Sequence, residues 1–187
     1  MRIKALVVLV LIIGFGAAGT ARSEEGIYYA RCNLKVLKGT YITWVNWQAA
    51  PQFLPVNTRF KVGGSGQKVT LTDTKTGKSY TLDTGNQDPR FLEKFLSRRP
   101  VNLKAFSKDV RDNITKAVAR MDMTRAQVYI AMGPPFWADG ATTEGSTYED
   151  ILKTNLWVYK RRRFGKNIGV EFESRGGTVI RTEGIWR

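Results

Sequence analysis

The sequence contains no histidine and only one cysteine, Cys32. Without histidine, the chain cannot carry Ser-His-Asp or Cys-His catalysis, bind a metal through imidazole or use histidine as a pH switch. A single cysteine can form neither an internal disulfide nor a structural zinc site, although it could pair with a second chain. We therefore expect a non-enzymatic protein with no catalytic residues, no metal site and no cofactor.

Acidic residues are scarce relative to basic ones. The 187 residues include 30 Lys and Arg but only 16 Asp and Glu, which gives a formal net charge of +14. Hydrophobic residues make up 42% of the chain and charged residues 25%, values typical of a globular protein of one domain or two small ones. The excess positive charge favours contact with anionic surfaces, or serves only to keep the protein soluble.

The N-terminus has an apolar run that is short for a membrane span. Arg2 and Lys4 precede the run at residues 5–19, and these 15 residues fall below the number of about 20 that a transmembrane helix needs. Residues 21–23, Ala-Arg-Ser, fit a small-x-small cleavage pattern. Residues 1–23 are therefore predicted to be a cleaved signal peptide, with an uncleaved anchor as the alternative. No cysteine stands where lipoprotein processing needs one, so we expect a periplasmic protein, at most peripheral to the outer membrane.

Residues 24–86 carry strand and turn signals at short spacing. Five segments rich in β-branched and aromatic residues are separated by turn residues such as Gly and Pro; they are residues 27–37, 41–47, 58–62, 68–73 and 78–83. In the last two segments Val69, Leu71, Tyr80 and Leu82 alternate with polar residues, as in a half-buried antiparallel hairpin. Short strands at this density predict a small all-β barrel.

Helical patterns follow the predicted barrel. Asp88 followed by Pro89 is typical of a helix N-terminus and predicts a linker helix within residues 87–105. Ser107 is the predicted N-cap of a second helix, whose apolar positions continue at helical spacing through Met121.

The clearest helix signals precede the C-terminal strands. Thr124 and Gln127 have the spacing of a capping box, and Gly133 followed by two prolines would end that helix. A polar loop over residues 136–151 then leads to three predicted strands, residues 156–164, 168–173 and 178–183. The predicted fold class is α+β: a small all-β barrel over residues 24–86, the linker, then two helices and a three-stranded antiparallel sheet over residues 106–187.

Six short motifs follow one another within residues 123–186. They are Met123-Thr124, Gln127-Val128, Gly133-Pro134-Pro135, Trp157-Val158-Tyr159, Val170-Glu171-Phe172 and Gly176-Gly177-Thr178-Val179. In this order they resemble the BamE (SmpA/OmlA) outer-membrane assembly family, although Asp122 replaces the usual glycine before the Met-Thr pair and the lipoprotein cysteine is missing. The resemblance implies two helices packed on a three-stranded antiparallel sheet, and a non-catalytic role in outer-membrane assembly or envelope integrity.

The N-terminal region has a second, shorter resemblance. Residues 54–58, Leu-Pro-Val-Asn-Thr, resemble the "P-x-G-T" turn of small bacterial barrels of the Src-homology-three type, with Asn57 in place of glycine. Together the resemblances imply envelope proteins of the assembly machinery as partners. Recognition of peptidoglycan or another cell-wall component is the alternative. Nucleic acid is not an expected partner, because export is predicted and the aromatic residues do not interleave with the basic ones.

Five cations lie within seven residues near the C-terminus: Lys160, Arg161, Arg162, Arg163 and Lys166. Alternation on the predicted strand would place Arg161 and Arg163 on the same face as Trp157. Because guanidinium groups match phosphate geometry, these five residues are the candidate site for anionic lipid or lipopolysaccharide. The alternative is a solvated hairpin end that prevents edge-to-edge aggregation.

Trp47, Phe136 and Trp137 are the candidate partner-binding aromatics. Trp44 and Trp47 are an odd number of positions apart, so a regular strand cannot bury both. Phe136 and Trp137 follow two prolines in a predicted loop, where burial is harder to arrange. Aromatic anchors dominate many interfaces, whereas the alternative is that these rings cover the core. Cys32 falls within a predicted strand and is expected to be buried.

Overall fold

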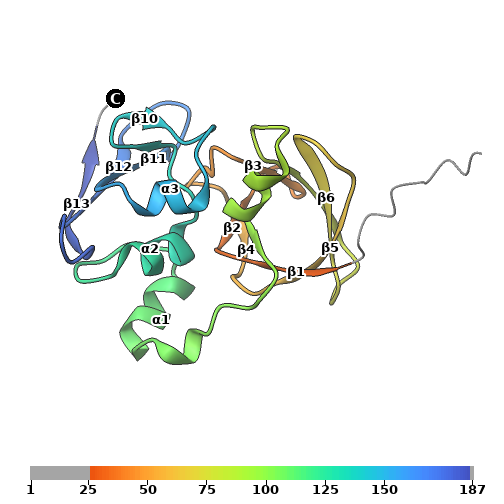
Figure 1. The fold of residues 1–187 in the computed structure, drawn as a ribbon, viewed down its shortest axis with the longest axis horizontal. Coiled ribbons are helices and arrows are strands. Elements are labelled where there is room, and N and C mark those ends of the chain that lie inside the picture. Colours follow the sequence, from red (N-terminus) through yellow and green to blue (C-terminus); the bar gives the residue numbers. More distant parts are fainter. Residues whose placement is uncertain (1–25, 186–187) are drawn as a thin grey trace, which may run out of the picture.

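The computed structural model describes residues 26–185, with the side chains of residues 26–183, and has a mixed α+β fold (Figure 1). The N-terminal half, residues 26–105, contains β1 (Ile27–Ala30), β2 (Leu34–Val36), β3 (Tyr41–Thr43), β4 (Gln52–Leu54), β5 (Arg59–Gly63), β6 (Lys68–Asp73), β7 (Ser79–Asp83), the 3₁₀ helix η1 (Pro89–Lys94), β8 (Leu96–Ser97) and the 3₁₀ helix η2 (Leu103–Ala105). The C-terminal half, residues 106–185, contains α1 (Lys108–Thr115), α2 (Arg125–Met132), β9 (Trp137–Ala138), β10 (Ala141–Thr142), α3 (Tyr148–Leu152), β11 (Leu156–Tyr159), β12 (Asn167–Phe172) and β13 (Val179–Ile185). The predicted α+β class is confirmed, while the predicted signal peptide lies outside the described residues.

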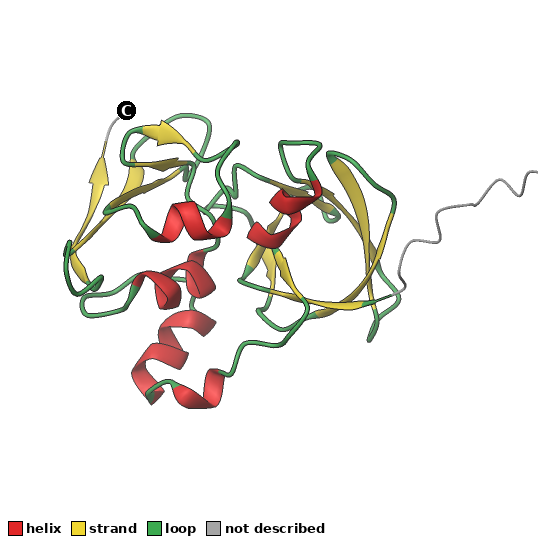
Figure 2. Ribbon diagram, in the orientation of Figure 1, coloured by secondary structure: helices red, strands yellow, loops and turns green. Residues whose placement is uncertain are grey.

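The main sheet of the N-terminal half curls over its apolar face. Its strands lie in the order β3-β7-β6-β5-β1-β8, and Figure 2 shows them curving around one side of the molecule. Val69 pairs with Leu82 and Leu71 with Tyr80, and all four side chains are buried. The alternation predicted for this hairpin is therefore confirmed. Strands β2 and β4 form a separate antiparallel pair.

The prediction of one continuous strand over residues 27–37 is wrong. A bend divides this segment into β1 and β2, because the backbone between them forms hydrogen bonds with distant parts of the chain. The Arg31 N–H donates to the carbonyl of Phe95 (2.8 Å), and the Asn33 N–H donates to that of Ile130 (3.0 Å). These two bonds replace the ladder that would have continued the strand.

Two other strands end earlier than predicted. The strand expected over residues 41–47 ends at Thr43, because the Asn46 N–H donates to the Thr43 carbonyl (3.0 Å) and closes a turn. The strand expected over residues 156–164 ends at Tyr159, where the next carbonyls accept hydrogen bonds from the N-terminal half. In both places the strand is ended by a backbone hydrogen bond, and the alternation of residue types does not predict such a bond.

The linker is a short 3₁₀ helix. Asp88 caps η1 as predicted, since its Oδ1 accepts a hydrogen bond from the Arg90 N–H (2.9 Å). The helix ends at Lys94, and Leu96, which lies within the range of the predicted linker helix, instead pairs with Ala30 of β1. The linker therefore adds a strand to the N-terminal sheet.

Helix α1 begins where predicted and ends sooner. The Ser107 hydroxyl accepts a hydrogen bond from the Val110 N–H (3.4 Å). The helix ends at Thr115, and Ala117 turns the chain with a φ of 54°. The prediction that the helix continues through Met121 is wrong, and the Met121 side chain is 55% exposed.

Helix α2 has the predicted capping box and the predicted end. The Thr124 hydroxyl accepts a hydrogen bond from the Gln127 N–H (3.3 Å), and Gln127 Oε1 accepts one from the Thr124 N–H (2.9 Å). Gly133 follows the last helical residue with a φ of 78°.

We expect Thr124→Ala to lower the free energy of unfolding by about 1 kcal/mol, because the Gln127 N–H in the first turn of α2 loses its side-chain partner. Urea denaturation of the variant and the parent measures the difference. Thr74→Ala is the control, since Thr74 is exposed and its hydroxyl makes no hydrogen bond within the described chain. Equal stability of the Thr124 variant and the parent would show that the capping box does not contribute.

The C-terminal sheet has five strands in the order β10-β9-β11-β12-β13, all antiparallel. The last three are the predicted strands, although their bounds differ. The prediction of a loop over residues 136–151 is wrong, because this segment contains β9, β10 and most of α3. A second capping box, between Thr147 and Asp150, starts α3.

A continuous core joins the two halves. The fully buried Tyr129 of α2 packs edge-on against Trp157 of β11, with ring centroids 6.0 Å apart. The Tyr129 hydroxyl also donates a hydrogen bond to the Lys94 carbonyl of η1 (3.0 Å). Within residues 26–185, no helix combines the length and the apolarity that a membrane span requires.

Candidate functional site

Residues 160–166, which connect β11 to β12, form an exposed segment that we call the cationic loop. Phe164 in this loop is 81% exposed. Its exposed cations are Arg161, Arg162, Arg163 and Lys166. The prediction that Arg161 and Arg163 share a strand face with Trp157 is wrong, because Trp157 is fully buried and both arginines lie beyond the end of β11. The loop therefore presents one large apolar side chain among cations.

The N-terminal half holds the base of the cationic loop. The Gln48 N–H donates to the Lys160 carbonyl (2.8 Å), and the Ala49 N–H donates to the Arg161 carbonyl (3.1 Å). These bonds fix the point at which the loop leaves the sheet, while the side chains of the following residues are exposed.

Lys160 lies apart from the other cations of the cluster, against aromatic rings. Its Nζ is 4.1 Å from the Trp137 ring centroid and 5.2 Å from that of Phe136. Phe136 stacks on Trp44 of the N-terminal half, with centroids 5.0 Å apart. All three rings are half-buried, as is Trp47. The structure thus places Phe136 and Trp137 at the junction of the two halves, where Lys160 covers them.

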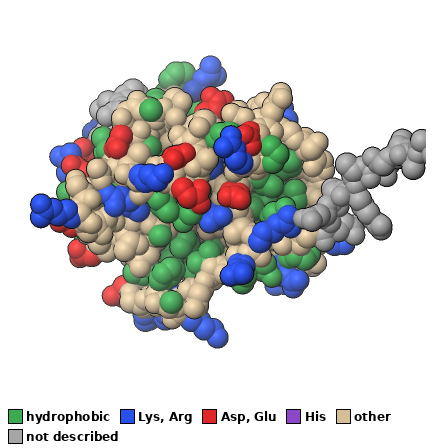
Figure 3. Space-filling model, viewed as in Figure 1, with side chains coloured by type: hydrophobic (Ala, Val, Ile, Leu, Met, Phe, Trp, Pro, Cys, Tyr) green, Lys and Arg blue, Asp and Glu red, His purple; other side chains and the backbone are tan. Residues whose placement is uncertain are grey.

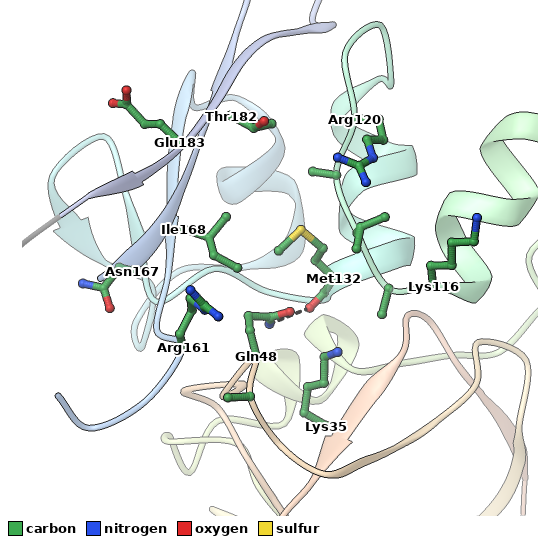
Figure 4. A pocket seen from close by; sticks show the side chains of 14 residues that line it. Lys35, Gln48, Lys116, Arg120, Met132, Arg161, Asn167, Ile168, Thr182 and Glu183 are labelled. Atoms are coloured by element: carbon green, nitrogen blue, oxygen red, sulfur yellow. Dashed lines mark hydrogen bonds between the residues drawn. The ribbon is translucent and has the colours of Figure 1, made fainter. Parts of the chain in front are cut away.

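An open cleft of about 470 Å³ lies between the two halves (Figure 4). Its walls come from β2, the segment after β3, the segment after α1, the end of α2, the cationic loop, β12 and β13. The charged residues among those described on its walls are Lys35, Lys116, Arg120, Arg161 and Glu183. Four cations therefore face one acid.

Lys35 is the most buried cation of the cleft. It lies in β2, where all three side chains are buried, and is only 6% exposed. Its Nζ is 5.0 Å from the centroid of the Phe53 ring, but it forms no ion pair or side-chain hydrogen bond with any described residue. Burial lowers the pKa of Lys35, and the nearby Cys32 thiol opposes this shift only in part.

Sequence reasoning did not find the cleft. Of its cations, only Arg161 belongs to the predicted cluster; Lys35, Lys116 and Arg120 come from three segments far apart in the chain. Each is a single basic residue with no spacing that relates it to the others. The one available signal was that Lys35 stands between Leu34 and Val36 and so interrupts an apolar strand.

Lys94 is a second buried cation, and it is fully partnered. Its Nζ donates hydrogen bonds to the carbonyls of Thr143 (2.9 Å) and Glu144 (3.0 Å), so it ties η1 to the segment before α3. Burial lowers the pKa of Lys94 to about 8, against a weaker opposite effect of Glu144. Lys94 is therefore structural.

Lys94 should make the free energy of unfolding depend on pH in the alkaline range. Its pKa of about 8 in the folded protein lies below that of an unfolded chain, about 10.4. Between these values the unfolded chain binds more protons, so stability rises with pH. We expect the unfolding free energy of the parent minus that of Lys94→Met to grow by up to about 1.4 kcal/mol per pH unit from about pH 8 to pH 10. Urea denaturation at several pH values measures it.

Cys32 and the buried tyrosines also titrate in alkali, but their effects are common to both proteins and cancel in that difference. A difference that does not vary over this pH range would contradict the lowered pKa of Lys94. Cys32 itself is fully buried, as predicted, and burial raises the pKa of its thiol to about 12.

The acidic side chains form no metal site in the described part of the chain. On the face drawn in Figure 3, acidic side chains occur at several places, with Lys and Arg side chains between them. Glu149 and Asp150 of α3 are exposed, as is Glu144. Within residues 26–185, no group of three His, Cys, Asp or Glu residues has the arrangement to hold a metal ion.

No family model, curated protein or solved structure matches this chain. The candidate sites therefore rest on geometry and charge: the cationic loop with Phe164, the aromatic junction covered by Lys160, and the cleft between the halves.

Proposed function

We propose that this protein is an exported, non-enzymatic cell-envelope protein that docks on an anionic surface through the cationic loop and takes part in outer-membrane assembly or envelope integrity. The surface it fits is one of phosphate groups, from phospholipid or lipopolysaccharide. Localisation in the periplasm, peripheral to the outer membrane, is part of the proposal. The observation that carries it is Phe164, 81% exposed between arginines and a lysine.

The loop has the chemistry of an interfacial contact. Each exposed basic residue near an anionic membrane contributes about 1 kcal/mol, and this attraction decays within a Debye length of about 8 Å at physiological salt. Burial of one Phe side chain adds about 1.5–3 kcal/mol. Because the base of the loop is held by both halves, the cations and the phenyl ring can approach a surface together.

The arrangement of the C-terminal half supports the proposed relationship to the BamE family. Two helices, α1 and α2, precede β11, β12 and β13, and α2 packs on this sheet through Tyr129 and Trp157. The curled sheet of the N-terminal half is compatible with the proposed small barrel, and Asn57 takes a φ of 68° in the turn where the resemblance needs a left-handed residue. On this proposal the partners are envelope proteins.

We expect the Arg162→Ser/Arg163→Ser variant to bind mixed phosphatidylethanolamine–phosphatidylglycerol vesicles about thirtyfold more weakly than the parent, from the loss of about 2 kcal/mol. Phe164→Ser should weaken binding about tenfold or more, because the ring no longer enters the interface. Vesicle sedimentation at several salt concentrations measures these affinities, and parent binding should fall steeply as salt rises.

Arg99→Ser/Lys104→Ser is the matched control, since it removes two exposed cations outside the loop and keeps the same net charge as the loop variant. Both double variants should melt like the parent. Equal weakening by the two would mean that total charge alone drives binding, and no weakening by either would remove the loop from the binding surface. If the parent sediments with purified sacculi and not with vesicles, the peptidoglycan alternative is the better one.

A further inference from the structure

We propose that the cleft between the two halves binds a small anionic molecule with an apolar body, whose phosphate or carboxylate group is held by Lys35. This site is distinct from the membrane-facing surface proposed above. It does not depend on docking of the cationic loop, although Arg161 belongs to both.

Lys35 carries a buried charge without a counter-charge. Buried ammonium groups are normally paired, because removal of the charge from water is costly unless an anion or several acceptors replace the water. Lys35 is 6% exposed, and its Nζ lies 5.0 Å from the centroid of the Phe53 ring. Within the described chain no carboxylate pairs with it, so a bound anion would supply the missing partner.

Two more cations of the cleft, Arg161 and Arg120, have no ion-pair partner among the described residues. Figure 4 shows Arg161 and Lys35 directed toward the space beside Gln48 and Met132, from opposite halves of the molecule. Neither Arg161 nor Arg120 forms a salt bridge or a side-chain hydrogen bond with a described residue. Glu183 is the one acid among the described wall residues, and its Oε1 lies 3.7 Å from Arg181 Nη2, which offsets its repulsion of an anion.

The remaining walls are suited to an apolar body. The segment after α1 supplies Ala117, Val118 and Ala119, while Met132 ends α2 and Ile168 lies in β12. A volume of about 470 Å³ lies within the range of about 300–1,000 Å³ that small-molecule sites occupy. Gln48 closes one side, where its Nε2 donates to the Met132 carbonyl (3.1 Å), as the dashed line in Figure 4 shows.

Titration calorimetry with soluble n-octyl phosphate and with octanoate tests the site, and their relative affinities tell which anionic group it prefers. We expect at least one of them to bind the full chain with a Kd below about 1 mM. Inorganic phosphate, which lacks the apolar body, and n-octyl glucoside, which lacks the charge, should each bind at least tenfold more weakly.

Lys35→Met should weaken binding of the preferred anion at least tenfold, and Arg120→Met about threefold to tenfold. Arg120 is exposed, so its variant keeps the test valid even if Lys35→Met fails to fold. Lys104→Met is the matched control outside the cleft and should bind like the parent. The proposal is overturned if neither anion binds the parent, if n-octyl glucoside binds as well as the anions, or if Arg120→Met and Lys104→Met have the same affinity. The vesicle experiment uses Arg162, Arg163 and Phe164, so the two proposals can fail separately.

Discussion

Replacement of Asn33 by leucine is expected to lower the free energy of unfolding by about 4 kcal/mol, because three buried backbone groups lose their partner. Asn33 Nδ2 donates to the carbonyls of Ile114 (2.6 Å) and Ala131 (2.9 Å), and Oδ1 accepts from the Val56 N–H (3.0 Å). The side chain is 2% exposed, so water cannot replace these bonds. One amide, in the residue before β2, therefore ties the N-terminal half to α1 and α2.

Urea denaturation of Asn33→Leu, followed by fluorescence and by circular dichroism, measures this loss. The matched control is Asn102→Leu, since Asn102 is exposed and makes no side-chain cap bond. The control should stay within about 0.5 kcal/mol of the parent. We also expect the parent to unfold in one transition with both probes. If Asn33→Leu is as stable as its control, Asn33 is not the tie between the halves.

Gly133→Ala is expected to destabilise the protein by about 4 kcal/mol, from backbone strain and overpacking together. Gly133 has φ 78° and ψ −166°, a conformation that residues with a Cβ rarely adopt. An added Cβ would lie 2.5 Å from Asn46 Nδ2 and 3.3 Å from Cys32 Sγ. Asn46 cannot easily move away, because it is buried and its Nδ2 donates to the Met132 and Pro134 carbonyls.

Gly77→Ala separates the two causes. Gly77 has a similar φ of 72°, but an added Cβ would meet no atom within 4 Å. Its variant should therefore lose only the conformational part, about 1–2 kcal/mol. Thermal or urea unfolding of both variants gives the comparison. Equal losses of stability would mean that contact between the added Cβ and the N-terminal half does not destabilise the Gly133 variant.

Features that depend on near neighbours in the sequence were the ones that could be predicted. The capping box of Thr124 and Gln127 and the alternation of Val69 and Leu71 arise within a few residues, so their spacing determines them. The end of β11 could not be predicted, because it depends on hydrogen bonds from the N–H groups of Gln48 and Ala49, far away in the chain. The position of Phe164 at the tip of an exposed loop follows from that early end.

The cleft was missed for the same reason. Lys35 was one basic residue in an apparent strand, and nothing near it in the sequence indicates that Arg120 and Arg161 face the same space. Burial of Lys35 with no counter-charge among the described residues becomes visible only when the two halves are packed together. By contrast, the cationic cluster was evident from composition, although its placement on a strand was wrong.

The central claim is that the cationic loop attaches an exported protein to the envelope. Its most direct test is to express the chain in cells and measure the share of it that sediments with the membrane fraction. We predict that the parent sediments with membranes and is released at about 1 M salt, where the Debye length falls to about 3 Å. A variant with Arg162→Ser, Arg163→Ser and Phe164→Ser should remain in the soluble periplasmic fraction, while Arg99→Ser/Lys104→Ser should sediment like the parent. Sedimentation of the loop variant in the same proportion as the parent, or recovery of the parent from the cytoplasm, would contradict the account.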